Sequence, residues 1–242
     1  MRRIPAIMFG IAILWLATTM AAPFTIPSGS VTDLKGGAEG RIDHPDVWAK
    51  MNPFAMAVYY VGDLNCHQLS ERSLYLNGNQ MPVCARDVGV IFGFTIGTSL
   101  LFLMVPCNNP YLTAFTLFPN KGKEAILRRM SVRSFVVAIG IVLLLPMAID
   151  GTIQFLTPYE STNPLRLATG LPAGIAIGLG LGAGMMTMFE MTEGDKRRWV
   201  ERYNSFMAKQ KEPVKVDKAK AGSEIDDGKE RRRGPKKRRR PE

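Results

Sequence analysis

Four long runs with almost no charged residue constrain this 242-residue chain more than any other feature. They cover about residues 4–24, 88–105, 134–156 and 167–188, and Asp150 is the one charged residue within them. Each run approaches the roughly 20 residues that cross a bilayer. Unsatisfied backbone groups are costly in lipid, so such runs form helices. The sequence therefore predicts an all-α fold, a polytopic membrane helix bundle of about four transmembrane helices.

The C-terminal end has the opposite composition. Residues 192–242 hold 18 Lys/Arg against 10 Asp/Glu, which accounts for +8 of the formal net charge of +10. Residues 208–242 contain no aromatic residue and only three of the larger aliphatic ones, so they cannot bury a core and are predicted to be disordered. The predicted division is a signal anchor or signal peptide forming the first span (1–24), an extracytoplasmic segment (25–86), a three-helix membrane core (87–191) and a basic cytoplasmic tail (192–242).

Positive residues set the predicted topology, because cytoplasmic loops carry an excess of Lys and Arg. The loop at 106–133 has five Lys/Arg and one acid, whereas residues 25–86 have five Lys/Arg and six acids. Together with the basic tail, these numbers predict a multi-pass protein of the cell membrane with both termini cytoplasmic.

Glycines recur every four residues in the second and fourth runs. Four-residue spacing places a row on one helix face, and small residues let membrane helices approach closely. The rows consist of Gly89, Gly93 and Gly97, and of Gly170, Gly174, Gly178 and Gly182. Packing within the chain, a homo-oligomer interface and a permeation path are all open interpretations.

Polar residues that this topology places near the outer membrane surface form the candidate site. Ionisable groups at membrane depth are costly and typical of functional sites. The predicted polar cluster consists of Cys66, His67, Gln68, Arg72, Cys84, Arg86, Asp87, Asp150, Gln154 and Arg166.

The order of these motifs carries a family resemblance. The stretch CHQLSERSLYLNGNQMPVCARDVGVIFGFTIG, followed by IDGTIQ and STNPLRLATGLPAG, resembles the prokaryotic membrane proteins of domain of unknown function 2085 over about residues 63–184. The resemblance implies a membrane protein and no particular activity. It also implies family-typical positions for Cys66, His67, Cys84, Arg86, Asp150, Gln154 and Arg166.

Cys66 and Cys84 have two interpretations based on thiol chemistry, a structural disulfide and a reactive dithiol. Cys66 and Cys84 would face an oxidising compartment, where a structural disulfide persists. Closing a loop of roughly 18 residues by a disulfide contributes about 3 kcal/mol in the chain-entropy model. Alternatively they form a reactive dithiol, with His67 and Arg86 lowering a thiol pKa. Cys107, the remaining cysteine, is predicted to lie across the membrane from this pair.

A metal site is a further interpretation of the same residues. Cys66, His67 and Cys84 have the ligand types of zinc, and Asp87 or Asp150 could complete four-coordination. Zinc is therefore a candidate cofactor, although an adjacent Cys-His pair is not a standard spacing for its ligands.

An anion site is the fourth interpretation. Arg72, Arg86 and Arg166 could bind a phosphate or an anionic headgroup, with Asp150 and His67 as acid and base if the site is hydrolytic. The alternative for Asp150 is an ion pair with one of these arginines.

Two other segments carry expectations. Residues 47–62 contain Trp48, Phe54, Tyr59 and Tyr60 and predict an interfacial helix bent near Pro53. In the tail, the polyanion-contact residues are Arg231, Arg232, Arg233, Lys236, Lys237, Arg238, Arg239 and Arg240.

Two functions follow from these features. In the first, the protein is a scaffold, anchor or accessory subunit of a larger membrane complex, and its tail contacts anionic lipids or ribosomal RNA, with DNA the least favoured partner. In the second, the outer polar cluster binds zinc, a small anion or an anionic headgroup, with hydrolysis at this site as one version of the hypothesis.

Overall fold

The computed structural model describes residues 2–36 and 40–190, together with residues 197, 200–201 and 204. The polyanion-contact residues of the tail, 231–240, lie outside the described residues. The elements are α1 (Arg3–Ala21), η1 (Ala22–Phe24), α2 (Pro45–Trp48), α3 (Pro53–Asn65), η2 (Ser70–Arg72), β1 (Ser73–Leu76), β2 (Asn79–Cys84), α4 (Ala85–Leu100), η3 (Leu101–Leu103), α5 (Pro110–Phe115), α6 (Asn120–Arg129), α7 (Val132–Leu156) and α8 (Asn163–Phe189).

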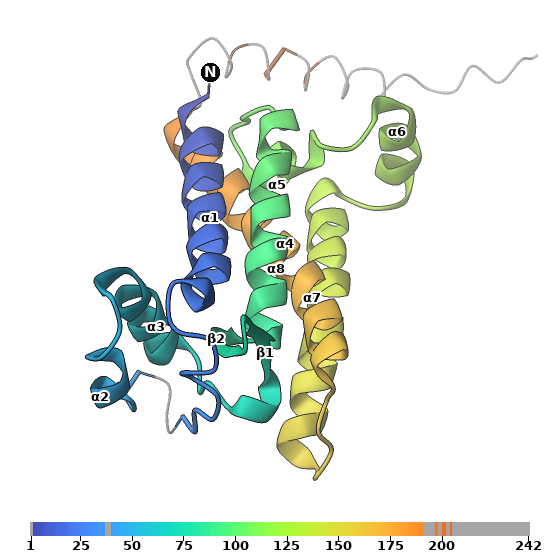
Figure 1. Cartoon of the computed structure of the whole chain (residues 1–242). Coiled ribbons are helices and arrows are strands. Elements are labelled where there is room, and N and C mark those ends of the chain that lie inside the picture. The colour runs from blue at the N-terminus through green and yellow to red at the C-terminus, as the bar shows by residue number, and fades with distance from the viewer. Residues whose placement is uncertain (1, 37–39, 191–196, 198–199, 202–203, 205–242) are drawn as a thin grey trace, which may run out of the picture. The chain divides into compact units, whose positions relative to one another are not determined.

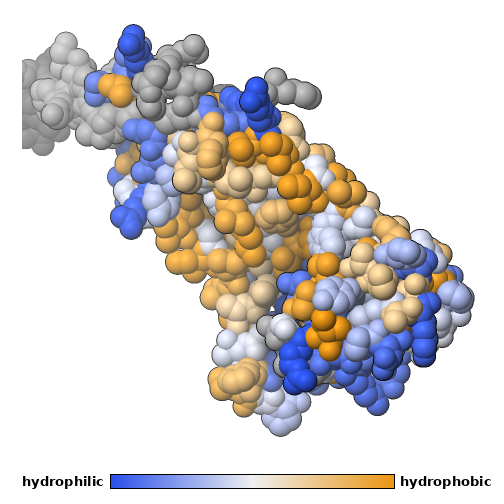
Figure 2. Space-filling view, turned by 90° about the vertical axis from the view of Figure 1, so that its left-hand side faces the viewer, coloured by the Kyte–Doolittle hydropathy of each residue, from blue (hydrophilic) through white to orange (hydrophobic). Residues whose placement is uncertain are grey.

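Within the described part of the chain, four helices are long and apolar enough to cross a membrane, which confirms the predicted helical membrane bundle. They are Arg3–Phe24, Ala85–Leu103, Val132–Leu156 and Asn163–Phe189. The short helices α2 and α3 and the β-hairpin lie at one end of this bundle, and α5 and α6 lie at the other (Figure 1). Figure 2 shows hydrophobic side chains over the middle of the visible face and hydrophilic ones toward its ends.

Glycines bring α4 and α8 into backbone contact. A Cβ atom added at Gly93 would lie 1.9 Å from the carbonyl oxygen of Leu171, and one at Gly174 would lie 2.1 Å from that of Val90. Gly89 and Gly170 make similar approaches at the hairpin end. The two rows therefore face each other within one chain, and this is the most extensive contact between helices among the described residues.

Helix α7 lies at the edge of the bundle. Asp150 is its only buried residue, and most of its aliphatic side chains are exposed. Because the helix is strongly apolar, this surface is suited to lipid. The polar groups near its C-terminal end hold α7 to the other spans, as described below.

A β-hairpin, which the sequence analysis did not predict, precedes α4. Strands β1 and β2 pair in antiparallel fashion across Asn77 and Gly78, both of which have positive φ. Asn-Gly turns favour this tight reversal. Buried amides fasten the hairpin: Asn79 Oδ1 accepts from the backbone N–H of Val31 at 3.1 Å, and Gln80 Oε1 accepts from that of Leu34 at 2.9 Å.

The segment before the hairpin differs from the predicted interfacial helix. Helix α2 ends at Trp48, and α3 begins only at Pro53, where the side chain of Asn52 caps it. Trp48 and Tyr59 are fully buried against each other instead of facing lipid. The indole N–H of Trp48 donates to the buried carboxylate of Asp63 at 2.8 Å. Aromatic residues that suit an interface equally suit a small core, and here two of them form one.

We predict that Gly174→Ala destabilises the protein and that Gly180→Ala does not. The new methyl group at residue 174 meets the backbone of Val90, whereas a Cβ at Gly180 has nothing within 4 Å. Overpacking of this kind costs about 1–3 kcal/mol. Thermal unfolding of both purified variants in detergent tests this, and equal midpoints for the two variants would contradict the proposed packing role.

Candidate functional site

The turn after α3 and the end of the hairpin bring two cysteines together. Cys66 follows α3 directly, and Cys84 ends β2 immediately before α4. The backbone N–H of Cys84 donates to Sγ of Cys66 at 3.3 Å. The antiparallel hairpin thus brings two residues separated by 18 positions into contact, at the N-terminal end of a membrane span.

The turn between Cys66 and η2 is held rigidly. Gln68 has a φ of 48° and is fully buried. Its Nε2 donates to the carbonyl oxygen of Pro82 at 2.7 Å. Gly36 packs so closely on the backbone of His67 that no side chain would fit there. Gln68, which belongs to the predicted polar cluster, therefore positions this turn through its amide.

A cavity of about 220 Å³ opens beside the turn. Side chains from the Cys66–Arg72 region, the start of α4, helix α7 and helix α8 surround it. Its lining consists of Cys66, His67, Gln68, Leu69, Arg72, Cys84, Arg86, Asp87, Met147, Gln154 and Arg166. The structure thus brings nine of the ten residues of the predicted polar cluster to one cavity. Asp150, the tenth, is the partner of Arg86.

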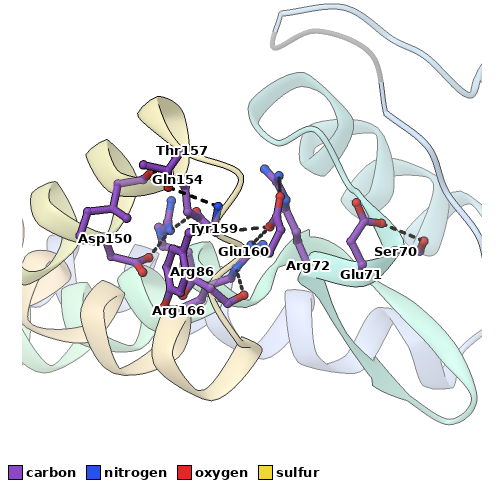
Figure 3. Close-up of polar contacts among 12 residues, drawn as sticks. Ser70, Glu71, Arg72, Arg86, Asp150, Gln154, Thr157, Tyr159, Glu160 and Arg166 are labelled. Carbon is purple, nitrogen blue, oxygen red and sulfur yellow. Dashed lines mark hydrogen bonds and ion pairs between the residues drawn. The ribbon is translucent and has the colours of Figure 1, made fainter.

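Two groups of ionic contacts surround the cavity (Figure 3). The guanidinium of Arg86 forms an ion pair with Asp150 and donates to Oε1 of Gln154 at 2.7 Å. Glu160, in the loop between α7 and α8, accepts from Arg72 and from Nη2 of Arg166, the latter at 2.7 Å.

The three arginines keep hydrogen-bond donors that these contacts do not use. Nε of Arg72 and Nε of Arg86 are buried without a partner. Arg166, of which 2% is exposed, donates through Nε to the carbonyl oxygen of Ser161 and through Nη2 to Glu160. Within the described part of the chain, Nη1 of each of the three has no protein acceptor. A guanidinium offers five N–H donors, so the cavity is rich in donors.

A second polar group lines the same cavity. The ligand atoms of Cys66, Cys84 and Asp87 all lie within 4.8 Å of one another. The thiol of Cys84 donates to Oδ2 of Asp87 at 3.2 Å. A hydrogen bond to Cys84, together with burial, raises the pKa of Cys66, and the same hydrogen bond lowers the pKa of Cys84. Cys84 is therefore the thiol of this pair that ionises more readily.

This group contains three of the residues named as zinc ligands from the sequence: Cys66, Cys84 and Asp87, the last of which was a candidate fourth ligand. His67 lines the cavity but does not belong to this set of neighbouring ligand atoms. Two thiols and a carboxylate are among the ligands that zinc accepts, and catalytic zinc sites use three protein ligands. The donor set therefore fits such an ion. In this structure, Cys66 and Cys84 are thiols without a disulfide between them.

The sequence analysis missed Glu160, which bridges two of the arginines. It is the single acidic residue in the short loop between α7 and α8. That position, at the same membrane surface as the cluster, is a signal that could have identified it. The buried amides of Asn79 and Gln80 were also missed, because nothing in their local sequence distinguishes them from exposed hairpin residues.

Comparison with known proteins gives the family. The family model described as "Predicted membrane protein (DUF2085)" matches residues 66–179. An uncharacterised protein of Methanothermobacter thermautotrophicus is 33% identical over 112 residues, which are 46% of this chain and 79% of that protein. The chain belongs to the DUF2085 family.

The region shared with this family contains every residue that lines the cavity, while α1, α2 and α3 precede it. A second DUF2085-like relative, an uncharacterised protein of Methanocaldococcus jannaschii, is 31% identical over 123 residues, or 51% of this chain. The chain spans 65% of the length of that relative. No solved structure matches the chain. The names of these two relatives state no activity.

The bridge at Glu160 predicts a pH dependence. Desolvation raises the pKa of Glu160, but its hydrogen bonds with Arg72 and Arg166 and their charges lower it by more, so it lies below the usual value. A depressed pKa in the folded state stabilises above the pKa of the unfolded chain, and this stabilisation is lost as the pH falls through the folded-state pKa. Glu160→Gln should therefore lower the unfolding midpoint near neutral pH.

The difference in unfolding midpoint between Glu160→Gln and the wild type should shrink at pH values below the usual pKa of a glutamate. Thermal unfolding at a series of pH values measures it. Glu71→Gln is the matched control, because the Glu71 side chain is exposed and its one side-chain contact is with neighbouring Ser70. A constant difference at every pH would show that the bridge does not act through the charge of Glu160.

Proposed function

We propose that this protein binds an anionic group in the cavity between the hairpin, α4, α7 and α8, on the outer face of the cell membrane. The observation that carries the proposal is the convergence of Arg72, Arg86 and Arg166 on one cavity with N–H donors to spare. Charge-assisted hydrogen bonds from guanidinium groups are the usual means of binding phosphate and carboxylate.

The lining of the cavity favours an anion by its charge and its donors. Three arginines and one acid, Asp87, are the charged groups among the residues that line the cavity. Asp150 and Glu160, which lie outside the lining, pair with these arginines and balance the remaining positive charge. These carboxylates lower the cost of holding arginines near the membrane, while leaving donors directed to a ligand.

The placement on the outer face rests on the distribution of positive residues. Residues 106–133 carry five Lys/Arg and one acid, and this loop lies at the opposite end of the bundle from the hairpin (Figure 1). By the positive-inside rule, the end with α5 and α6 is cytoplasmic. Both termini are then cytoplasmic in a protein with four spans.

Binding of inorganic phosphate by the full chain in an uncharged detergent tests the proposal. Arg72→Gln should weaken binding about tenfold, since a hydrogen bond to a charged group contributes ~1.5–3 kcal/mol. Arg72 is suitable because its side chain is 36% exposed and its replacement leaves the buried Arg166 in place. Isothermal titration calorimetry gives the dissociation constants.

Two further variants sharpen this test. Glu160→Gln removes the acid that competes for Arg72 and Arg166, so phosphate should bind more tightly to it than to the wild type. Arg41→Gln, at an exposed position away from the cavity lining, should leave binding unchanged. Equal affinities for Arg72→Gln, Glu160→Gln and Arg41→Gln would rule out the arginine site.

A metal site is the second candidate function, favoured by the proximity of Cys66, Cys84 and Asp87. Cys66, Cys84 and Asp87 would hold a zinc ion there, and the ion would supply a Lewis acid in the cavity. Protein purified without chelator should then contain about one zinc per chain. Cys84→Ser should lose the zinc, and Cys107→Ser, whose thiol lies elsewhere, should retain it.

Thiol mass-tagging separates the metal from the disulfide. With zinc bound, Cys66 and Cys84 should become reactive once a chelator is added. If they react only after reduction and elemental analysis finds no metal, the pair is a structural disulfide instead, and the anion site is unaffected.

The scaffold, anchor or accessory role remains a proposal of a different kind. This role depends on the basic runs of residues 231–240, which lie outside the described residues. Contact of these runs with anionic lipid or ribosomal RNA rests on their charge alone. Deleting them would leave the cavity intact, so the two functions are separable.

A further inference from the structure

An apolar groove lies next to the arginine cavity on the lipid-facing side of α7. It has a volume of about 450 Å³ and is lined by Arg86, Leu144, Met147, Ala148, Gly151, Thr152, Phe155 and Leu156. Arg86 and Met147 line both the groove and the polar cavity. The two spaces therefore adjoin at one guanidinium.

Gly151 keeps this junction open. A Cβ added at Gly151 would have Nη1 of Arg86 as its one neighbour within 4 Å, at 3.9 Å. The lack of a side chain there leaves the guanidinium accessible from the groove. Like Nε, Nη1 of Arg86 has no acceptor among the described residues.

The length and position of the groove match one leaflet. Its lining residues run from Leu144 to Leu156, a rise of about 18 Å along a helix. Half of a typical hydrocarbon core is roughly 15 Å. The groove ends beside the loop that carries Glu160, at the same end of the bundle as the hairpin. Phe155 and Leu156 are 87% and 70% exposed there.

From this arrangement we infer that the anionic ligand is a membrane lipid, which enters sideways from the bilayer. Its headgroup occupies the cavity among Arg72, Arg86 and Arg166, and an acyl or isoprenoid chain lies in the groove along α7. The inference rests on the proposed anion site and names its ligand class. A ligand with both an anionic head and an apolar chain uses both spaces, whereas a free anion uses only the cavity.

The test uses the full chain in neutral detergent with three probes: phosphatidylglycerol, phosphatidylcholine with the same chains, and inorganic phosphate. Native mass spectrometry measures bound lipid, and calorimetry measures phosphate. Gly151→Leu fills the groove at the junction, and Gly140→Leu is the matched control on the same helix, where a Cβ has nothing within 4 Å.

We expect phosphatidylglycerol to bind the wild type more tightly than phosphatidylcholine does. Gly151→Leu should weaken phosphatidylglycerol binding about tenfold and leave phosphate binding unchanged, and Gly140→Leu should change neither. If Gly151→Leu and Gly140→Leu bind phosphatidylglycerol equally, the groove is not the lipid path and the inference is overturned.

A series of chain lengths gives a second test that needs no variant. Affinity of the wild type should rise from dihexanoyl to dioctanoyl phosphatidylglycerol, because longer chains bury more apolar surface. Equal affinities along the series, with phosphate bound as tightly, would overturn the inference while leaving the anion site standing. If neither phosphate nor phosphatidylglycerol binds, the proposed anion site itself has failed.

Discussion

The backbone contact between α4 and α8 determines where the charged groups of the cavity lie. In the absence of a hydrophobic drive between membrane helices, close approach depends on small residues. At the hairpin end, a Cβ at Gly170 would be 2.3 Å from the carbonyl oxygen of Arg86. Arg166 is one helical turn before Gly170. The glycine row that packs the helices therefore also places two arginines side by side at the edge of the membrane.

Placing these arginines there requires neutralisation, and the acids that supply it organise the neighbouring elements. Asp150 is the one buried residue of α7, and its ion pair with Arg86 holds an otherwise lipid-exposed helix against the bundle. Glu160 holds the loop after α7 to η2 and α8 through Arg72 and Arg166. Buried ion pairs contribute little net stability, but breaking one leaves an unpaired charge. The network thus specifies the position of α7 more than it stabilises the fold.

The sequence predicted the features that depend on composition over long windows. The four spans follow from apolar length, and the glycine rows follow from a four-residue period. The hairpin was missed although Asn77-Gly78 is a strong turn signal, because its strands are short and β2 shows no alternation of buried and exposed residues. Trp48 and Tyr59 were expected to face the membrane, because aromatic composition does not distinguish an interface from a small core.

For the site, topology predicted which residues share a membrane surface, but it could not predict which of them touch. The pairing of Arg86 with Asp150, and not of Arg166 with Asp150, depends on the rotation of α7 about its axis, which its uniform hydrophobicity leaves undetermined. The proximity of Cys66, Cys84 and Asp87 depends on the hairpin, which the sequence did not predict.

The arrangement of α7 is the reason for proposing a membrane lipid as the ligand of the polar cavity. A site for a soluble anion needs only an opening to water. It does not need a lipid-facing helix beside it. Here α7 is the least buried span of the four, it carries a glycine near the arginine, and the Arg86–Asp150 ion pair joins it to the cavity. At its other end, Phe135 packs against Phe115 and Phe118. In the lipid site that we infer, Asp150 keeps its ion pair with Arg86. Nη1 of the same guanidinium, 3.9 Å from where a Cβ at Gly151 would lie, remains available to a headgroup that enters from the groove.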